Sequence, residues 1–297
     1  MIISTDALSY KYGKQLILDA VSLEVPKGSI YGFLGPNGAG KTTTIKILLS
    51  LLLSSKKNVF LFGKELSANR TEILSKIGSL VEQPAIYGHL SGRENLRNRA
   101  LLLKVSKERV EEILSLVGLA EAGGKKAGKY SLGMKQRLGI GLALLGDPEL
   151  LILDEPTNGL DPNGIIEIRL LLRKLALELG KTVFVSSHLL SEVERTATHV
   201  GIINKGRLLF QGSIEALHAI NKPVINIHVD DLSGAAGVLL KEGIATDVLS
   251  DNLVLPYTSH VQMGSVNTLL VQNGFTVYSI ANSRKDLEHV FLNITNN

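Results

Sequence analysis

The chain has 297 residues, of which 44% are hydrophobic and 20% are charged, and this globular composition excludes a disordered chain. Its formal net charge of +4 is too small to indicate nucleic-acid binding by itself. The absence of cysteine excludes a disulfide framework and thiolate metal sites, and it is compatible with a reducing cytosol. We see no secretory signal and no run of the ~18 apolar residues that a membrane span needs, so we expect any work at a membrane to require a partner.

The first strong signal is a strand, a glycine-rich loop and a helix at residues 29–53. SIYGFLG predicts the strand, KTTTIKILLSLLL predicts the helix, and we expect residues 45–55 to form a buried helix. Between strand and helix, GPNGAGKTT matches the phosphate-binding pattern G-x-x-x-x-G-K-[ST]. Its glycines and the helix N-terminus can turn N–H groups toward one anion, and the flanking elements argue against a chance glycine turn.

Within this loop, Lys41 is predicted to reach the β- and γ-phosphates of a nucleotide as a point charge. The hydroxyl of Thr42 is predicted to bind Mg²⁺. The other loop residues predicted to bind ATP are Gly35, Asn37, Gly38, Ala39, Gly40 and Thr43.

The strand signal disappears at residues 84–145, where three stretches have helical periodicity. We therefore expect a helical insertion attached to the sheet. Its first helix is predicted to begin after Ser91, with Glu94 placed three residues later to complete a capping box.

The stretch LLILDEP, residues 150–156, predicts a strand that carries Asp154 and Glu155 to its carboxyl end, where open sheets bind ligands. Asp154 is predicted to hold Mg²⁺, and Glu155 to orient or deprotonate the attacking water. An acidic strand end facing solvent is the alternative, and the phosphate loop argues against it. The elements that follow are a helix at 162–179 and strands at 182–188 and 199–206. Strands alternating with helices predict a mostly parallel α/β sheet covered on both faces.

The character of the sequence changes near Ile220. From residue 221 we predict a strand, a helix, a hairpin around Asp251 and Asn252, a second helix and a strand, with a closing helix at 283–295. The order βαββαβ is that of a small ferredoxin-like α+β domain, which we expect at residues 221–297.

With these motifs in this order, residues 1–220 resemble the nucleotide-binding domain of an ABC transporter. The resemblance implies a P-loop NTPase fold with a RecA-like core, an antiparallel β-subdomain and the helical insertion, and an ATPase that uses ATP and Mg²⁺. It also implies that Tyr12, in YKYGKQ, stacks on adenine, with Tyr10 as its competitor. Gln83, in VEQPAIYG, resembles the glutamine that contacts Mg²⁺ or water and senses the membrane partner.

Two later motifs extend the resemblance. NGLDP, residues 158–162, resembles the D-loop, with Asp161 at its key position. His188, in VSSHLL, resembles the switch histidine, which would hydrogen-bond the γ-phosphate and help to position the water. A helix cap or an ordinary core histidine is the alternative interpretation of His188.

The stretch YSLGMKQ resembles the family signature, in which a serine is followed by two glycines and a glutamine. Two copies pack head to tail in the family, so the signature would grip the γ-phosphate held by the phosphate loop of a second copy. The signature residues are Ser131, Leu132, Gly133 and Met134, followed by the cations Lys135 and Arg137. Leu132 and Met134 replace the usual glycine and glutamine, which leaves the phosphate contacts open.

Several stretches, including SLGMKQRLGIGLALL and VEQPAIYGHLSGRENL, resemble the bacitracin-resistance and lantibiotic-immunity branch of the family. This implies a subunit that powers a separate permease for antimicrobial peptides. The permease would dock near residues 84–99 and hold the chain on the cytoplasmic face of the membrane. Export of a drug, sodium or a lipid stays open as an alternative. A soluble ATPase acting on the ribosome or on nucleic acid is less favoured, and we expect no nucleic-acid partner.

Overall fold

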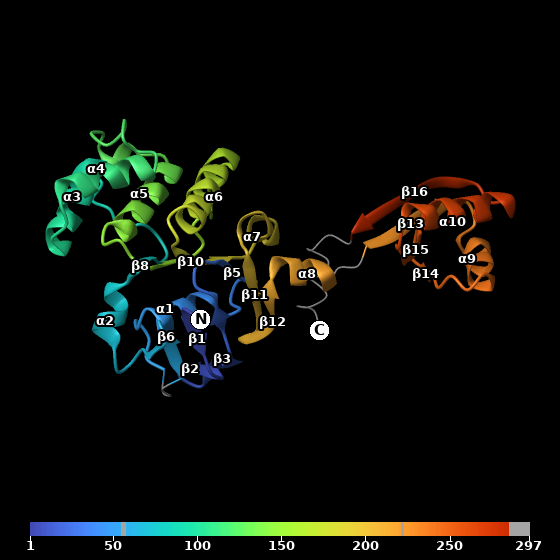
Figure 1. Ribbon diagram of the computed structural model, residues 1–297, viewed down its shortest axis with the longest axis horizontal. Coiled ribbons are helices and arrows are strands. Elements are labelled where there is room, and N and C mark those ends of the chain that lie inside the picture. The colour runs from blue at the N-terminus through green and yellow to red at the C-terminus, as the bar shows by residue number, and fades with distance from the viewer. Residues whose placement is uncertain (55–57, 221–222, 285–297) are drawn as a thin grey trace. The chain divides into compact units, whose positions relative to one another are not determined.

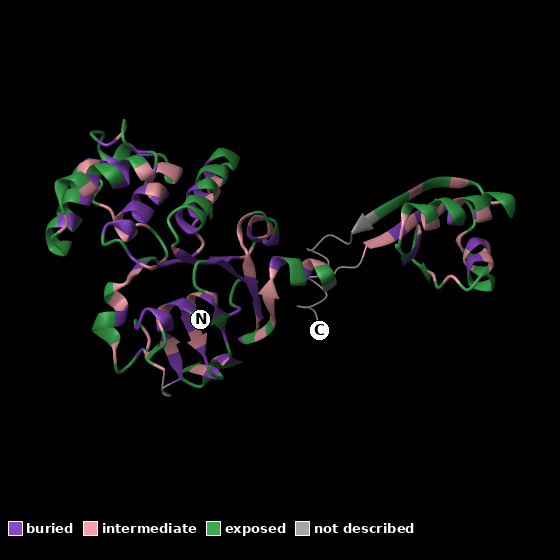
Figure 2. Cartoon of the chain, viewed as in Figure 1, coloured by how far each residue is buried: buried purple, intermediate pink, exposed green. Residues whose placement is uncertain are grey.

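The computed structural model describes residues 1–54, 58–220 and 223–284, so most of the closing helix expected at 283–295 lies outside the described residues. The chain divides into two compact units, Met1–Ile214 and Glu215–Asn297 (Figure 1). Each unit has buried side chains of its own (Figure 2). Within the described residues, no helix is both long enough and apolar enough to cross a membrane.

A six-stranded sheet forms the centre of the first unit, within the part of the chain that the structure describes. Its strands, from edge to edge, are β12 (Arg207–Ser213), β11 (His199–Asn204), β5 (Ile30–Leu34), β10 (Thr182–Ser187), β9 (Leu150–Leu153) and β8 (Ile77–Leu80). Neighbouring strands from β11 to β8 are parallel, and only β12 pairs in the antiparallel sense. The predicted mostly parallel α/β sheet is confirmed.

Both faces of this sheet are covered, which explains why its strands read as continuous apolar runs. Leu151 and Leu153 of β9 belong to a core that they share with helices α3–α6, whereas Leu150 and Ile152 belong to a core that includes α1 and the N-terminal strands. The helices of this unit are α1 (Lys41–Leu48), α2 (Arg70–Ser75), α3 (Gly92–Leu103), α4 (Lys107–Leu116), α5 (Leu132–Leu144), α6 (Pro162–Leu177) and α7 (Leu190–Thr196), with a short 3₁₀ helix at Ala127–Lys129.

Short antiparallel strands form the β-subdomain expected from the family fold. One sheet has the order β4 (Glu24–Val25), β1 (Ile3–Thr5), β6 (Val59–Leu61) and β7 (Lys64–Glu65). A separate hairpin joins β2 (Leu8–Tyr12) to β3 (Gln15–Val21). Both lie beside α1 on the side of the central sheet opposite α3–α5 (Figure 1).

The helical insertion is confirmed, and so is the capping box at its first helix. The hydroxyl of Ser91 accepts from the backbone N–H of Glu94, and the Glu94 carboxylate accepts from the N–H of Ser91. The buried helix expected at residues 45–55 is confirmed for residues 45–48 and wrong for residues 49–54, and residue 55 lies outside the described residues. Helix α1 ends at Leu48 because Ser50 takes a left-handed φ of 55°, and Leu51 and Leu53 are exposed.

All but the first residue of helix α8 (Ile214–Ile220) belongs to the second unit, and the sequence analysis does not predict this helix. The expected boundary at residue 221 lies after this helix, whereas the chain divides after its first residue, Ile214. The order βαββαβ follows, formed by β13 (Pro223–Val229), α9 (Leu232–Lys241), β14 (Asp247–Val248), β15 (Leu253–Pro256), α10 (His260–Gln272) and β16 (Val277–Arg284). The strands pair antiparallel in the order β14-β15-β13-β16, as in a ferredoxin-like fold.

Candidate functional site

The loop between β5 and α1 has the backbone that a phosphate site needs. Gly38 and Gly40 have φ angles of 80° and 109°, which side chains other than glycine rarely adopt. At Gly35 a Cβ would collide with the carbonyl oxygen of Ile203, so only glycine fits against β11 there. These three glycines hold a compact turn at the N-terminus of α1, where backbone N–H groups can receive an anion.

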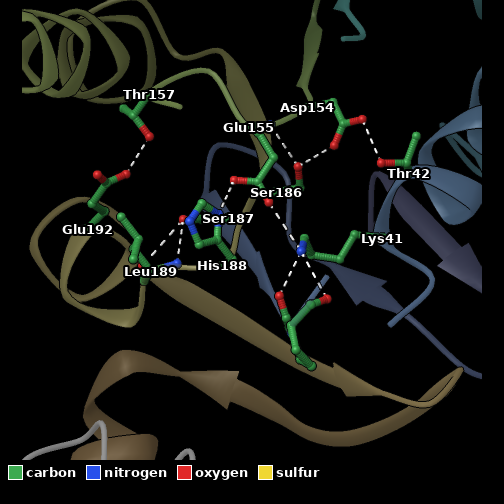
Figure 3. A network of polar contacts seen from close by, with 12 residues as sticks. Lys41, Thr42, Asp154, Glu155, Thr157, Ser186, Ser187, His188, Leu189 and Glu192 are labelled. Atoms are coloured by element: carbon green, nitrogen blue, oxygen red, sulfur yellow. Dashed lines mark hydrogen bonds and ion pairs between the residues drawn. The ribbon is translucent and has the colours of Figure 1, made fainter. Parts of the chain in front are cut away.

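Lys41, the first residue of α1, is buried, with only 6% of its surface exposed. Its Nζ donates to the carbonyl oxygens of Gly35 at 2.6 Å and Pro36 at 3.3 Å. The same Nζ lies 3.1 Å from Oε1 of Glu155 (Figure 3). The ammonium group is therefore held inside the loop, and its charge is balanced by the carboxylate at the end of β9.

Asp154 joins the loop to two neighbouring strands. Its Oδ2 accepts from the hydroxyl of Thr42 at 2.9 Å, and its Oδ1 accepts from the hydroxyl of Ser186 at 2.6 Å. Ser186 reaches Asp154 because β9 and β10 are parallel and in register, with Val185 beside Leu153. A carboxylate and a hydroxyl oxygen side by side fit Mg²⁺, which binds through few protein oxygens and keeps water and phosphate ligands.

Glu155 and His188 meet at the same edge of the sheet (Figure 3). Nδ1 of His188 lies 2.8 Å from Oε2 of Glu155, and since a carboxylate can only accept, Nδ1 carries the proton. Glu155 has a left-handed φ of 48°, and its N–H donates to the hydroxyl of Ser186 at 2.9 Å. The sequence analysis missed Ser186. The only feature of the sequence that points to Ser186 is that a polar residue ends a strand, and this strand lies next to the strand that carries Asp154.

We call residues 35–43 together with Asp154, Glu155, Ser186 and His188 the nucleotide half-site, and residues 131–134 the signature half-site. In the latter, the hydroxyl of Ser131 caps α5 by accepting from the N–H of Met134 at 3.2 Å. No hydrogen bond or ion pair between described residues joins the signature half-site to residues 35–43.

The side chain of Leu132 is half exposed, and a Cβ placed on Gly159 would lie 3.3 Å from it. Asp161 caps α6, since its carboxylate accepts from the N–H of Gly164 at 3.2 Å. The signature and the D-loop are therefore neighbours on one surface. The nearby Arg137 is not free to supply charge there, because its guanidinium binds the Val117 and Gly118 carbonyls and Glu167.

Tyr12 and Tyr10 differ in exposure. Tyr12 lies at the end of β2 with 71% of its surface exposed, whereas Tyr10 is partly buried and packs against the core. This difference favours Tyr12 as the ring that is free to stack on a base. Gln83 follows β8 and is also exposed.

The loop that carries Gln83 contacts both α1 and α5, and the sequence analysis predicted neither contact. Glu82 lies 2.8 Å from Nζ of Lys46, and this hydrogen bond, more than the charge, lowers the pKa of Glu82 and raises that of Lys46. On the other side, a Cβ on Gly139 would lie 2.8 Å from the Cβ of Pro84, so glycine allows this loop to touch α5.

A groove of 450 Å³ opens beside this loop. Its walls come from β8, α3 and α5, and they include Gln83, Tyr87, Asn95, Arg99, Leu102 and Gly139. Parts of the stretch expected to contact a permease, residues 84–99, thus line a hollow of the surface.

The sequence pattern of the ABC transporter family matches residues 18–158. The bacitracin transport ATP-binding protein BcrA of Bacillus licheniformis is 44% identical to this chain, over 99% of the chain and 97% of BcrA. The lantibiotic transport ATP-binding protein SrtF of Streptococcus pyogenes is 43% identical, over 69% of the chain and 87% of SrtF.

Solved structures are similar as well. CbiO1 of Clostridium perfringens, described as part of the ABC transporter complex CbiONQ, matches with a TM-score of 0.69 and 26% identity, covering 81% of this chain and 95% of CbiO1. A dimeric ATP-binding cassette in a post-hydrolysis state with ADP and Pi matches with a TM-score of 0.63 and 25% identity, covering 71% of this chain and 98% of that cassette.

Proposed function

The chain belongs to the ABC transporter family as an ATP-binding subunit that couples ATP hydrolysis to transport, and we propose that its cargo is an antimicrobial peptide of the bacitracin type. The observation that carries this proposal is the reach of the similarity. The match to BcrA spans both units of this chain, whereas the 204 residues matched to SrtF are too few to include both units in full. Bacitracin is therefore favoured over a lantibiotic.

For hydrolysis, we assign the phosphates to the nucleotide half-site. The Lys41 ammonium is now satisfied by two carbonyls and Glu155, and the stronger charge of a triphosphate would draw it away. Glu155 would then lose its cation and become free to accept a proton from water, while His188 still orients it. Thr42 and Asp154 would hold Mg²⁺, which supplies charge neutralisation at the phosphates.

The remaining ligands of ATP come from two other places. We assign Tyr12 to the adenine ring because it is exposed, and Gln83 to the edge of the Mg²⁺ site and to the groove. Ser131, Gly133 and the start of α5 have no partner among residues 35–43, which supports their use on the phosphates of a second copy. Two copies related by a two-fold axis would complete two sites, with Asp161 at the contact.

A separate membrane permease is the second partner that we propose. The groove beside Gln83 is the surface that would receive it, and docking there would place the chain at the cytoplasmic face of the membrane. Because the loop of Gln83 touches α5 through Pro84 and Gly139, a partner in the groove would act on the signature helix directly.

The cargo is tested by resistance. The chain is expressed together with a candidate membrane permease in a bacitracin-sensitive bacterium, and the inhibitory concentrations of bacitracin, a lantibiotic and a hydrophobic drug are measured. We expect protection against bacitracin, which Lys41→Ala abolishes. Protection against only one of the other compounds would make the cargo wrong, and full protection by Lys41→Ala would contradict the ATP-driven mechanism.

A further inference from the structure

Besides the contact between Glu155 and His188, a second contact joins the loop after β9 to the segment after β10. The hydroxyl of Thr157 donates a hydrogen bond to the carboxylate of Glu192, and both side chains are partly buried. Figure 3 shows the two contacts together, each bridging from the loop after β9 to the segment after β10. The proposed hydrolysis uses neither Thr157 nor Glu192.

Both sides of this double contact are short and stiff. Only Pro156 separates Thr157 from Glu155, and the proline ring fixes its own backbone φ. On the other side, α7 begins two residues after His188, and Glu192 lies in its first turn. A shift of α7 therefore moves His188 and Glu192 together, and a shift of Thr157 carries Glu155 with it.

The surroundings make the Thr157–Glu192 hydrogen bond hard to replace. It borders a cavity of 30 Å³ between α6, α7 and β10 whose walls include Ile168 and Leu172. Arg169 and Glu192 are the charged side chains that line this cavity, and Nε of Arg169 is buried without a hydrogen-bond partner among the described residues. A hydrogen bond that is partly shielded from water is stronger than one in water, and an acceptor that loses its donor there is costly.

We propose that Thr157 and Glu192 are a positioning pair, which sets the distance between Glu155 and His188 and so keeps the carboxylate aimed at the attacking water. This inference rests on the proposed roles of Glu155 and His188. The pair acts through these two residues and does not touch ATP. Its loss should therefore change the rate of hydrolysis and leave nucleotide binding intact, because small misplacements of a catalytic group cost rate.

The test uses the full-length chain and the variant Thr157→Val, which keeps the shape of the side chain and removes the hydroxyl. We expect kcat for ATP hydrolysis to fall roughly tenfold while the affinity for ATP stays unchanged. Thr157→Ser keeps the hydroxyl and should restore kcat. In a His188→Ala background, Thr157→Val should add no further loss, since two residues that act as one unit are not additive.

The matched control is Thr196→Val, the same chemical change at the other end of α7 and on the same cavity. It should leave kcat unchanged. A Thr157→Val protein with normal kcat, or with a loss that adds in full to that of His188→Ala, would overturn the inference. The variant Glu155→Gln distinguishes a failure of the proposed role of Glu155 from a failure of the positioning pair. If it hydrolyses ATP normally, the proposed role of Glu155 fails, whereas an inactive Glu155→Gln beside a normal Thr157→Val rejects the positioning pair alone.

Discussion

The nucleotide half-site and the signature half-site of the cassette are prepared in different ways. In the first, charged groups are partnered within the chain, as Asp154 is by Thr42 and Ser186. In the second, Ser131 only caps its own helix, and Leu132 is half exposed. One copy of the chain thus pairs the charges of its nucleotide half-site by itself, whereas its signature half-site contains no ion pair among the described residues.

The physical reason is the cost of burying charge. An ammonium or a carboxylate taken out of water is stable only when it is paired and hydrogen-bonded, so Lys41 and Asp154 need their partners inside the chain. The signature half-site carries no charged side chain. The N–H groups at the start of α5 are uncharged and can stay in water until an anion arrives. One copy of the chain can therefore offer these N–H groups to phosphates that are bound by another copy.

The largest effect is expected at the nucleotide half-site, from Glu155→Gln. If Glu155 accepts the proton from water as we propose, removing its carboxylate should lower kcat at least about a hundredfold, while the amide still fills the same space. Affinity for ATP, measured by titration with a fluorescent analogue, should be kept. A rate near that of the unchanged protein would show that the catalytic base lies elsewhere and that Glu155 does not have the role proposed for it.

The second prediction concerns the signature half-site and uses Glu155→Gln as the background. With ATP and Mg²⁺ this variant should form a dimer in light scattering, because hydrolysis cannot reopen it. Adding Ser131→Arg places a bulky side chain at the surface that the second copy must approach, and we expect it to abolish the dimer without changing ATP binding by the monomer. Dimers that survive Ser131→Arg would contradict action between two copies.

How much of this contrast the sequence can predict depends on how local each feature is. The phosphate loop, Asp154 and Glu155 are contiguous patterns in the right flanking elements, so their positions were predictable. Ser186 was not, because its role depends on the register between β9 and β10. The contact between Lys46 and Glu82 likewise depends on where two distant segments pack.

The end of α1 shows the opposite limitation. Its apolar residues continue past Leu48, so the pattern predicts a longer helix than the structure has. The left-handed backbone of Ser50 ends the helix, and the N–H groups of Leu51 and Leu52 close on the carbonyl of Lys46. An apolar run alone therefore did not reveal which leucines are buried.

The third prediction is Ser186→Ala, which removes one partner from two groups of the nucleotide half-site. Oδ1 of Asp154 would lose its donor and the N–H of Glu155 would lose its acceptor. We expect a loss of about 1–3 kcal/mol in the free energy of unfolding, measured by denaturant titration, and a smaller fall in kcat than Glu155→Gln causes. Ser79→Ala, at an exposed serine of β8, is the stability control. Equal stability of both variants would mean that Asp154 is satisfied without Ser186.

The smallest effect is expected at an exposed contact of the same region, between Lys46 and Glu82. Exposed ion pairs contribute little, so Glu82→Gln should change the hydrolysis rate of the isolated chain less than about twofold. Glu72→Gln, in a similar exposed pair with Lys64, is the matched control. A loss as large as that from Ser186→Ala would mean that burial is not what distinguishes the nucleotide half-site.

The pH dependence of this contact has a definite sign. The hydrogen bond to Lys46 lowers the pKa of Glu82, so its stabilisation is present above the ordinary carboxyl pKa and is lost as the pH falls through the lowered pKa. The same contact raises the pKa of Lys46, so its share is lost only as the pH rises through that raised value. The difference in unfolding midpoint between the unchanged protein and Glu82→Gln should therefore be greatest near neutral pH and should vanish in acid. A difference that persists in acid would have to come from packing, because Glu82 is then uncharged in both states.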